Sequence, residues 1–349
     1  MDLGRIAPQG AENPPTNIID PSNGPDAEFM DPLRQTLIDC YCNVLGYGNG
    51  PLQVSSEHWA LFWLSDTENL ESLVAEARVS TITRVTMKGW LGNGDQVRNA
   101  IIKPWNQTRR CSSTCTTISP IQSPANSPSS RASSSRSRQE RNLCSERDKD
   151  RCVFTHAGQI VHIAHICPFS ISSLLDNGSN FWALLGIFWR EERIDRWKRA
   201  IFTRKCTEVC QNLVSLSPSA HAYWDANLFA LKPLKVSSDK KSLTVQLFWL
   251  HPHSRMKLMP LEMRPFLPSQ LEGSVNNVKL FNCVTHEIIQ SGHRITICTD
   301  DPDKRPLPSY DLLEMQWYLH RVSALAGASE VFGFHENADE DDDGVVYSD

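Results

Sequence analysis

Two stretches of sequence decide the expected fold of this chain: QIVHIAHICPFS at residues 159–170 and QNLVSLSPSAHAYWDANLFALKP at residues 211–233. The run QIVHIAHI is short, apolar and rich in β-branched residues, which predicts a strand. Pro168 cannot donate a hydrogen bond to a partner strand, so the strand should end before it and leave His165 at its end. The run LVSL predicts a second short strand at the start of the later stretch.

A helix is predicted directly after LVSL, because Ser217 is a good N-cap and Pro218 suits the first helical position. His221 and Asp225 lie four residues apart in this helix. That spacing places both side chains on one face, one turn apart, which is the geometry for two ligands of one divalent ion. The expected unit is therefore strand, strand and helix, with titratable side chains on two of its elements.

These residue types match the needs of phosphodiester hydrolysis: a base for the water, a cation for the charge on the phosphate, and a group that holds the base in line. A neutral imidazole near pH 7 suits the base, a role that we assign to His165. Asn212 is expected to hydrogen-bond the ring and orient it. His221 and Asp225 would hold the metal ion. Each residue alone is more often structural, and only their joint order favours a catalytic site.

At this point the chain resembles the HNH nucleases, and within them the HNH_2 type found in many uncharacterised fungal proteins. The resemblance covers roughly residues 147 to 330, and it implies a ββα-metal core in which His165 is the first histidine, Asn212 the asparagine and His221 the second histidine. The matching stretches are RDKDRCVFTHAG (147–158), AHICPFS (164–170), NFWALLGIFW (180–189), CQNLVSLSPSAHAYWDANLFALKP (210–233), and the later LTVQLFWL and LPSYDLLEMQW.

The chain departs from the family pattern in three places. Many HNH enzymes have an acidic or histidine ligand directly before the base histidine, where this chain has Ala164. Relatives with this alanine often carry an acidic residue three positions before the histidine, where this chain has His162. Strand alternation would point His162 and His165 to opposite faces, so His162 is expected either as a third ligand or as a packing residue. His156 occupies the position where relatives have the glycine of a tight turn.

Composition predicts several regions along the 349 residues. With 40% hydrophobic residues the chain has enough apolar material for at least one sizeable core. The later segments KSLTVQLFWL, VKLFNCVTHEII and HRITICTDD are expected to be strands, and YDLLEMQWYLHRVSALAGA a long helix. The expected regions are a disordered arm (1–30), a small mixed N-terminal region (31–105), a Ser/Arg/Pro-rich linker (106–146), the nuclease domain with its extension (147–334) and an acidic tail (335–349).

The formal charge of −5 is unlike that of a dedicated nucleic-acid binder, so a binding surface must be local. The helical insert NFWALLGIFWREERIDRWKRAIF supplies candidate phosphate contacts, while its aromatic side chains are expected to cover the core. The basic candidates in and just after it are Arg190, Arg193, Lys198, Arg199, Arg204 and Lys205.

No secretory h-region and no run of about 20 apolar residues is present, which predicts an intracellular protein, with nucleus and cytoplasm left open. The 11 cysteines are expected to be mostly reduced thiols.

The sequence thus predicts an α+β protein: a ββα-metal nuclease core with a helical insert and a C-terminal β-rich extension. The expected function is an endonuclease that uses one divalent metal ion and acts on nucleic acid, with double-stranded DNA the expected substrate. Magnesium or manganese suits an oxygen-rich shell, and zinc or nickel suits imidazole ligands. The alternative is a catalytically degenerate HNH-derived module that binds nucleic acid or a protein partner.

Overall fold

The computed structural model describes residues 24–46, 50–106, 128–172, 180–202 and 207–327. The acidic tail (335–349), most of the expected N-terminal arm and the first part of the expected linker lie outside these residues. Within the described part, no helix is both long enough and apolar enough to cross a membrane. The cysteines that are described are free thiols.

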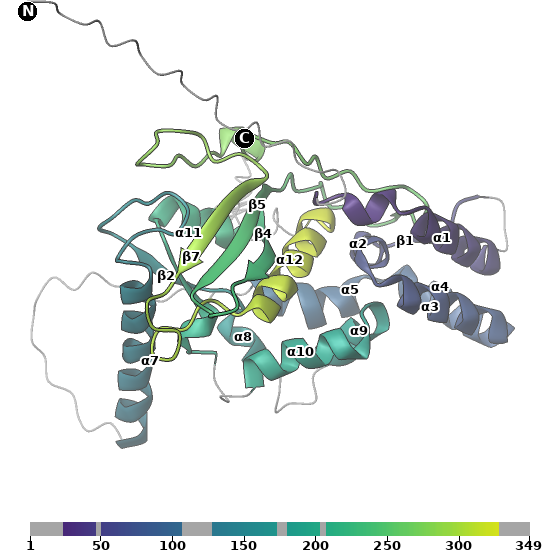
Figure 1. Ribbon diagram of the computed structural model, residues 1–349. Coiled ribbons are helices and arrows are strands. Elements are labelled where there is room, and N and C mark those ends of the chain that lie inside the picture. Colours follow the sequence, from purple (N-terminus) through teal and green to yellow (C-terminus); the bar gives the residue numbers. More distant parts are fainter. Residues whose placement is uncertain (1–23, 47–49, 107–127, 173–179, 203–206, 328–349) are drawn as a thin grey trace, which may run out of the picture.

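The N-terminal region is helical and gathers at one side of the molecule (Figure 1). It opens with the 3-10 turn η2 (Ala27–Met30), and its helices are α1 (Pro32–Leu45), α2 (Ser56–Leu64), α3 (Thr67–Val79), α4 (Thr81–Leu91), α5 (Asp95–Val97), the π-helical turn η3 (Arg98–Ile102) and α6 (Lys103–Asn106). The short strand β1 (Gln53–Val54) pairs with β6 (Met259–Pro260) and joins this region to a much later part of the chain. The β-branched stretch VSTITRVTMKGWL (79–91) suits a strand as well as a helix. In the structure it forms helix α4.

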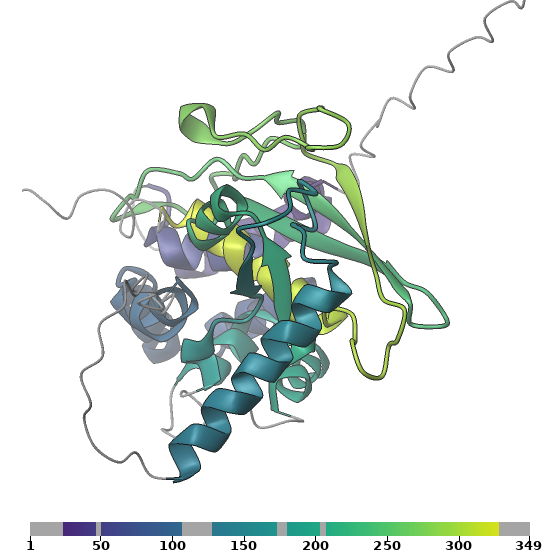
Figure 2. The same ribbon diagram turned by 90° about the vertical axis from the view of Figure 1, so that its left-hand side faces the viewer.

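Helix α7 (Pro128–Arg147) occupies the second half of the segment expected to be a linker. It stands on the opposite side of the molecule from α1–α4, and its C-terminal end meets the site strands (Figures 1 and 2). Cys144 forms a small buried cluster with Cys210 and Leu213. The buried Arg147 guanidinium donates hydrogen bonds to the carbonyl oxygens of Cys210, Leu213 and Pro306. The composition of this segment is dominated by Ser and Arg and gives no sign of these buried contacts.

The predicted strand–strand–helix unit is present. Strand β2 (His162–His165) pairs antiparallel with β3 (Leu213–Leu216), with His165 opposite Leu213, and α11 (Pro218–Asp225) follows directly. We call β2, β3 and α11 the hairpin–helix unit. Between the two strands lies the helical insert, made of α8 (Phe169–Ser172), α9 (Phe181–Phe188) and α10 (Glu191–Phe202), and then the 3-10 turn η4 (Cys210–Asn212).

A three-stranded antiparallel sheet follows, in the order β4 (Phe229–Val236), β5 (Ser242–Trp249) and β7 (His293–Cys298). The sequence made no prediction for β4; its Pro233 is tolerated because β4 is an edge strand, and the register shifts just after it. The expected strand over VKLFNCVTHEII is wrong. This segment (278–289) has only an isolated bridge between Phe281 and Ile288, with a positive φ angle at His286, and the 3-10 turn η5 (Val275–Asn277) lies just before it.

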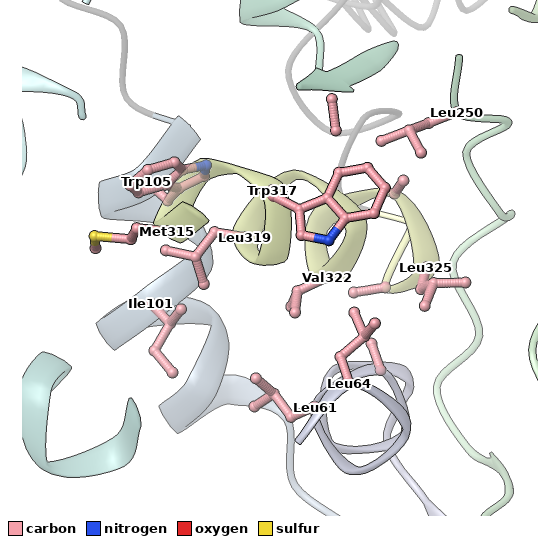
Figure 3. Close-up of a cluster of buried hydrophobic side chains, with 14 of the residues drawn as sticks. Leu61, Leu64, Ile101, Trp105, Leu250, Met315, Trp317, Leu319, Val322 and Leu325 are labelled. Atoms are coloured by element: carbon pink, nitrogen blue, oxygen red, sulfur yellow. The ribbon is translucent and has the colours of Figure 1, made fainter. Parts of the chain in front are cut away.

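One hydrophobic core joins the N-terminal helices to the rest of the molecule. The long helix α12 (Tyr310–Leu325) lies at its centre and packs on β4 and α2. Figure 3 shows Leu61 and Leu64 of α2 facing Val322 and Leu325 of α12, with Ile101 and Trp105 beside them. In the insert, Phe188, Trp189 and Trp197 are buried, so the expected core role of these aromatic residues is confirmed. The mixture of helices and small antiparallel sheets confirms the α+β class.

Candidate functional site

The hairpin–helix unit is fixed by local signals and by one tertiary hydrogen bond. The Ser217 hydroxyl accepts a hydrogen bond from the backbone N–H of Ala220, as an N-cap should, and Pro218 opens the helix. The indole of Trp224 on α11 donates to the carbonyl oxygen of His165 at 3.1 Å. The helix is therefore tied to the end of strand β2, next to the expected base.

The two faces of β2 have different surroundings. Ala164 is 1% exposed and belongs to the main core, whereas Ile163 packs against the small cluster beside α7. Because side chains alternate along a strand, His162 shares the side of Ala164, and His165 shares the side of Ile163. The family position that often holds a ligand is thus a buried core residue in this chain.

His162 and His221 face one another across the unit. Their Nδ1 atoms are 3.1 Å apart, so one ring carries the hydrogen and the other accepts it. Burial, followed by the neighbouring His162 and His165, lowers the pKa of His221 to about 4. His221 is therefore a neutral imidazole at physiological pH, and it lies within electrostatic reach of both His162 and His165.

Asp225 lies on the other side of the His221 ring. Its Oδ2 atom is 3.7 Å from His221 Nε2, whereas His162 approaches Nδ1. Burial raises the pKa of the Asp225 carboxyl to about 7. The three expected ligands therefore do not converge on one point, since two of them approach opposite nitrogens of the third.

The arrangement fits a metal ion only in part. Two nitrogens that bind one zinc ion at about 2.0–2.1 Å lie roughly 3 Å apart, so His162 and His221 suit two adjacent positions on one ion. Asp225 does not reach the same position. Across the described ranges, no group of three or more His, Cys, Asp or Glu side chains is arranged to hold a metal ion.

His165 turns toward Glu208, a residue that the sequence did not single out. The distance from His165 Nε2 to Glu208 Oε1 is 2.8 Å, and the two side chains are 19% and 15% exposed. The second carboxylate oxygen is 3.5 Å from Nε of Arg141 on α7. Glu208 lies four residues before Asn212, and no periodicity or motif around it signals this contact.

Asn212 acts on the backbone and not on the imidazole, which corrects the hydrogen bond expected from the sequence. Its Oδ1 accepts from the N–H of Cys167, and its Nδ2 donates to the carbonyl oxygens of Cys167 and Thr207. Both amide hydrogens are used, so none remains for the ring of His165. Asn212 therefore holds two chain segments together. One is at Cys167, two residues after His165, and the other is at Thr207, one residue before Glu208.

His156 adopts the conformation that the glycine position requires. Its φ angle is 56°, in the left-handed region, within a turn closed by the bridge between Arg151 and Gly158. The turn is thus formed with a histidine where the resemblance leads us to expect glycine, at a strain typical of a non-glycine residue there.

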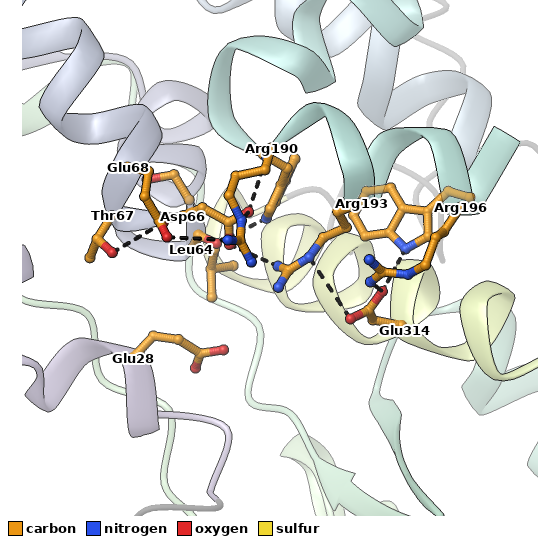
Figure 4. Close-up of polar contacts among 12 residues, drawn as sticks. Glu28, Leu64, Asp66, Thr67, Glu68, Arg190, Arg193, Arg196 and Glu314 are labelled. Atoms are coloured by element: carbon orange, nitrogen blue, oxygen red, sulfur yellow. Dashed lines mark hydrogen bonds and ion pairs between the residues drawn. The ribbon is translucent and has the colours of Figure 1, made fainter. Parts of the chain in front are cut away.

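Two of the expected phosphate contacts, Arg190 and Arg193, are held in ion pairs within the fold, which argues against that role for them. Arg190 and Arg193 form ion pairs with Asp66, and Arg193 also lies near Glu314. Arg196 pairs with Glu314 and Asp311. Figure 4 shows these guanidinium groups directed at carboxylates of α12 and of the start of α3. Arg204 and Lys205 lie outside the described residues.

Comparison with known proteins identifies one region. No curated protein and no solved structure matches the chain. Residues 152–232 match the family model HNH_2, described as HNH endonuclease. This segment contains His162, His165, Asn212 and His221, together with all of β2, β3 and α11. The matched segment suggests nuclease function, and the resemblance expected from the sequence is confirmed for residues 152–232.

Proposed function

We propose that this protein is an endonuclease that hydrolyses phosphodiester bonds in DNA, with His165 as the general base. The observation that carries the proposal is the group of three imidazoles on the hairpin–helix unit, within the segment that matches the HNH endonuclease family. An imidazole that burial holds neutral, as it does His221, is suited to proton transfer and to metal binding near pH 7.

Each residue of the unit has a distinct role in the proposed reaction. His165 takes a proton from a water molecule, whose oxygen attacks phosphorus, and the bond from phosphorus to the leaving 3′ oxygen breaks. The leaving oxygen takes its proton from solvent. Asn212 fixes the backbone after His165, so the ring stays at the end of β2. Trp224 fixes His165 from the opposite side through its carbonyl oxygen.

His162 and His221 would hold a divalent ion, which when bound supplies positive charge to the phosphate and the leaving oxygen. Asp225 is placed to accept a hydrogen bond from His221 Nε2 and so to orient that ring. Two imidazole ligands favour zinc or nickel, and water ligands would leave room for magnesium or manganese.

The surface near α7 offers better phosphate contacts than α10 does. Arg138 on α7, and Lys149 and Arg151 in the turn after it, are exposed. Among the described residues none of these three has an acidic partner within 4 Å. Because the turn at 148–151 adjoins β3 through the hydrogen bond from the Ser215 N–H to Asp148, Lys149 and Arg151 lie beside the unit. We propose that they contact the backbone of double-stranded DNA.

A second candidate is a module that binds nucleic acid or a protein partner without cleaving. The observations that favour it are Ala164 buried where many relatives have a ligand, and the failure of Asp225 to join His162 and His221. Such a module should keep its fold and bind no metal ion.

Plasmid nicking by the purified protein with Mg²⁺, Mn²⁺, Zn²⁺ or Ni²⁺, and with EDTA, tests the proposal. We expect metal-dependent nicking that His165→Ala lowers by about 100-fold or more, as loss of a general base does. The matched control is His251→Ala, a partly exposed histidine outside the unit, which should nick at the wild-type rate. Folded protein that nicks with none of these ions would favour the binding module.

A further inference from the structure

The Glu208 carboxylate joins three segments that are distant in sequence. One oxygen meets His165 at the end of β2, and the other lies near Arg141 of α7. Glu208 itself lies in the segment that enters η4. The Glu208 and His165 side chains are largely shielded from solvent, whereas Arg141 is 35% exposed. A carboxylate in such a position interacts more strongly with an imidazole than it would in water.

The position of Glu208 is fixed by its neighbours and does not depend on Arg141 alone. The carbonyl oxygen of Thr207 accepts from the Asn212 amide. On the other side, the N–H of Cys210 donates to the Glu140 carboxylate, and the carbonyl oxygen of Cys210 accepts from Arg147. The backbone on each side of Glu208 is therefore held, and the side chain is presented to His165 by a rigid segment.

We propose that Glu208 is the positioning residue for His165, which deepens the proposed function and rests on it for its catalytic consequence. At 2.8 Å the carboxylate accepts a hydrogen bond from Nε2–H of the ring. This contact selects the tautomer with hydrogen on Nε2, so the lone pair that accepts the proton of water is on Nδ1. After the transfer, both ring nitrogens carry hydrogen and Glu208 faces the resulting imidazolium, whose charge it stabilises.

Glu208 thus takes the orienting role that was expected of Asn212. A base histidine needs a third group that orients it. Asn212 has both amide hydrogens committed to the backbone, and Glu208 makes the contact with the ring. Arg141 approaches the second oxygen of Glu208, the one that does not contact His165, and so helps to hold the carboxylate in place.

Glu208→Gln tests the proposal because it keeps the size of the side chain and removes the charge. An amide can turn its NH₂ toward the ring, which stabilises the wrong tautomer and costs as much as about 10⁴-fold in serine proteases. We expect nicking to fall by at least about 100-fold at an unchanged KM. Glu208→Asp, which keeps the carboxylate at a shorter reach, should restore part of the rate. Glu140→Gln is the matched control, because Glu140 holds the same segment without touching His165, and it should keep the wild-type rate and tautomer.

The tautomer of His165 gives a readout that needs no nuclease activity. In ¹⁵N-histidine-labelled protein, with the His165 signal assigned by its loss in His165→Ala, long-range ¹H–¹⁵N spectra distinguish hydrogen on Nε2 from hydrogen on Nδ1. We expect the Nε2–H form in the wild type and a shift toward Nδ1–H in Glu208→Gln. An unchanged tautomer overturns the proposal, whether or not the protein cleaves DNA. A shifted tautomer in a protein that cleaves nothing supports the role of Glu208 and counts against the proposed function alone.

Discussion

Two regions of the molecule contain clusters of titratable side chains, and they differ in whether their charges are paired. Where α10 meets α12 and the start of α3, each of three arginines has at least one carboxylate within 4 Å (Figure 4). Glu314 also accepts a hydrogen bond from the indole of Trp197. We call this region the α10 joint. Its charges are mutually compensated, and its function is to hold the insert against the rest of the fold.

His221 and Asp225 of the hairpin–helix unit lack such compensation. Burial lowers the pKa of His221 to about 4 and raises that of Asp225 to about 7, so both groups tend toward their neutral forms near pH 7. Within the described residues, no lysine or arginine forms an ion pair with Asp225. Partly buried groups that lack a compensating charge weaken folding and are characteristic of functional sites. The comparison teaches that pairing, and not the number of charged residues, separates a structural cluster from a candidate site.

The largest effect that the comparison predicts is on activity, with little effect on stability. His221→Ala should lower nicking by at least about 100-fold, because the variant loses one of the two imidazoles that face each other. Its free energy of unfolding should change by less than about 1 kcal/mol, since the lost hydrogen bond is to an exposed partner. Nicking rates and urea titrations check both parts. A variant that cleaves normally, or that unfolds easily, would place His221 among the structural residues.

The sequence was sufficient for the parts of the unit that depend on local chemistry. These signals determine the structure of only the few residues around them. They are the cap Ser217 with Pro218 after it, the four-residue run of β3, and the proline that follows β2. The family match then confirms that these elements belong together. Candidates on the unit could be named because their spacing along one helix and one strand is enough to place them.

The remaining features depend on contacts between segments far apart in sequence. Glu208 meets His165 from 43 residues away, and Arg193 meets Asp66 and Glu314 from opposite directions along the chain. Single-sequence patterns carry no signal for such pairs. The amide of Asn212 could equally have reached a ring or a backbone group, and only the fold decides between them.

Acidification should lower the stability of the fold outside these two regions, because the core contains neutral histidines of its own. Burial lowers the pKa of both His58 and His320 to about 4. An unfolded histidine titrates near 6.5, so between pH 6.5 and 4 the unfolded state binds more protons and stability falls as pH falls.

Each of these two histidines should contribute a slope of up to about 1.4 kcal/mol per pH unit in that window. Urea titrations at pH 7, 6 and 5 measure it. His320→Asn should lower the stability at pH 7 and flatten the slope, because the lost residue no longer takes up a proton on unfolding. An unchanged slope would show that His320 is not held neutral by the fold.

The smallest expected effect is at the α10 joint, where loss of charge should weaken the fold and leave the chemistry intact. Glu314→Gln keeps an oxygen that can accept from Trp197 but removes the ion pairs with Arg193 and Arg196. We expect a loss of about 1–2 kcal/mol in the free energy of unfolding, measured by urea titration. The matched control is Glu68→Gln, whose side chain is 57% exposed and pairs with Arg190 at the surface, and it should cost less than about 0.5 kcal/mol. Nicking per folded molecule should be unchanged in both variants. A Glu314→Gln protein that is stable but cleaves slowly would break the comparison, because compensated charges would then serve the reaction as well as the fold.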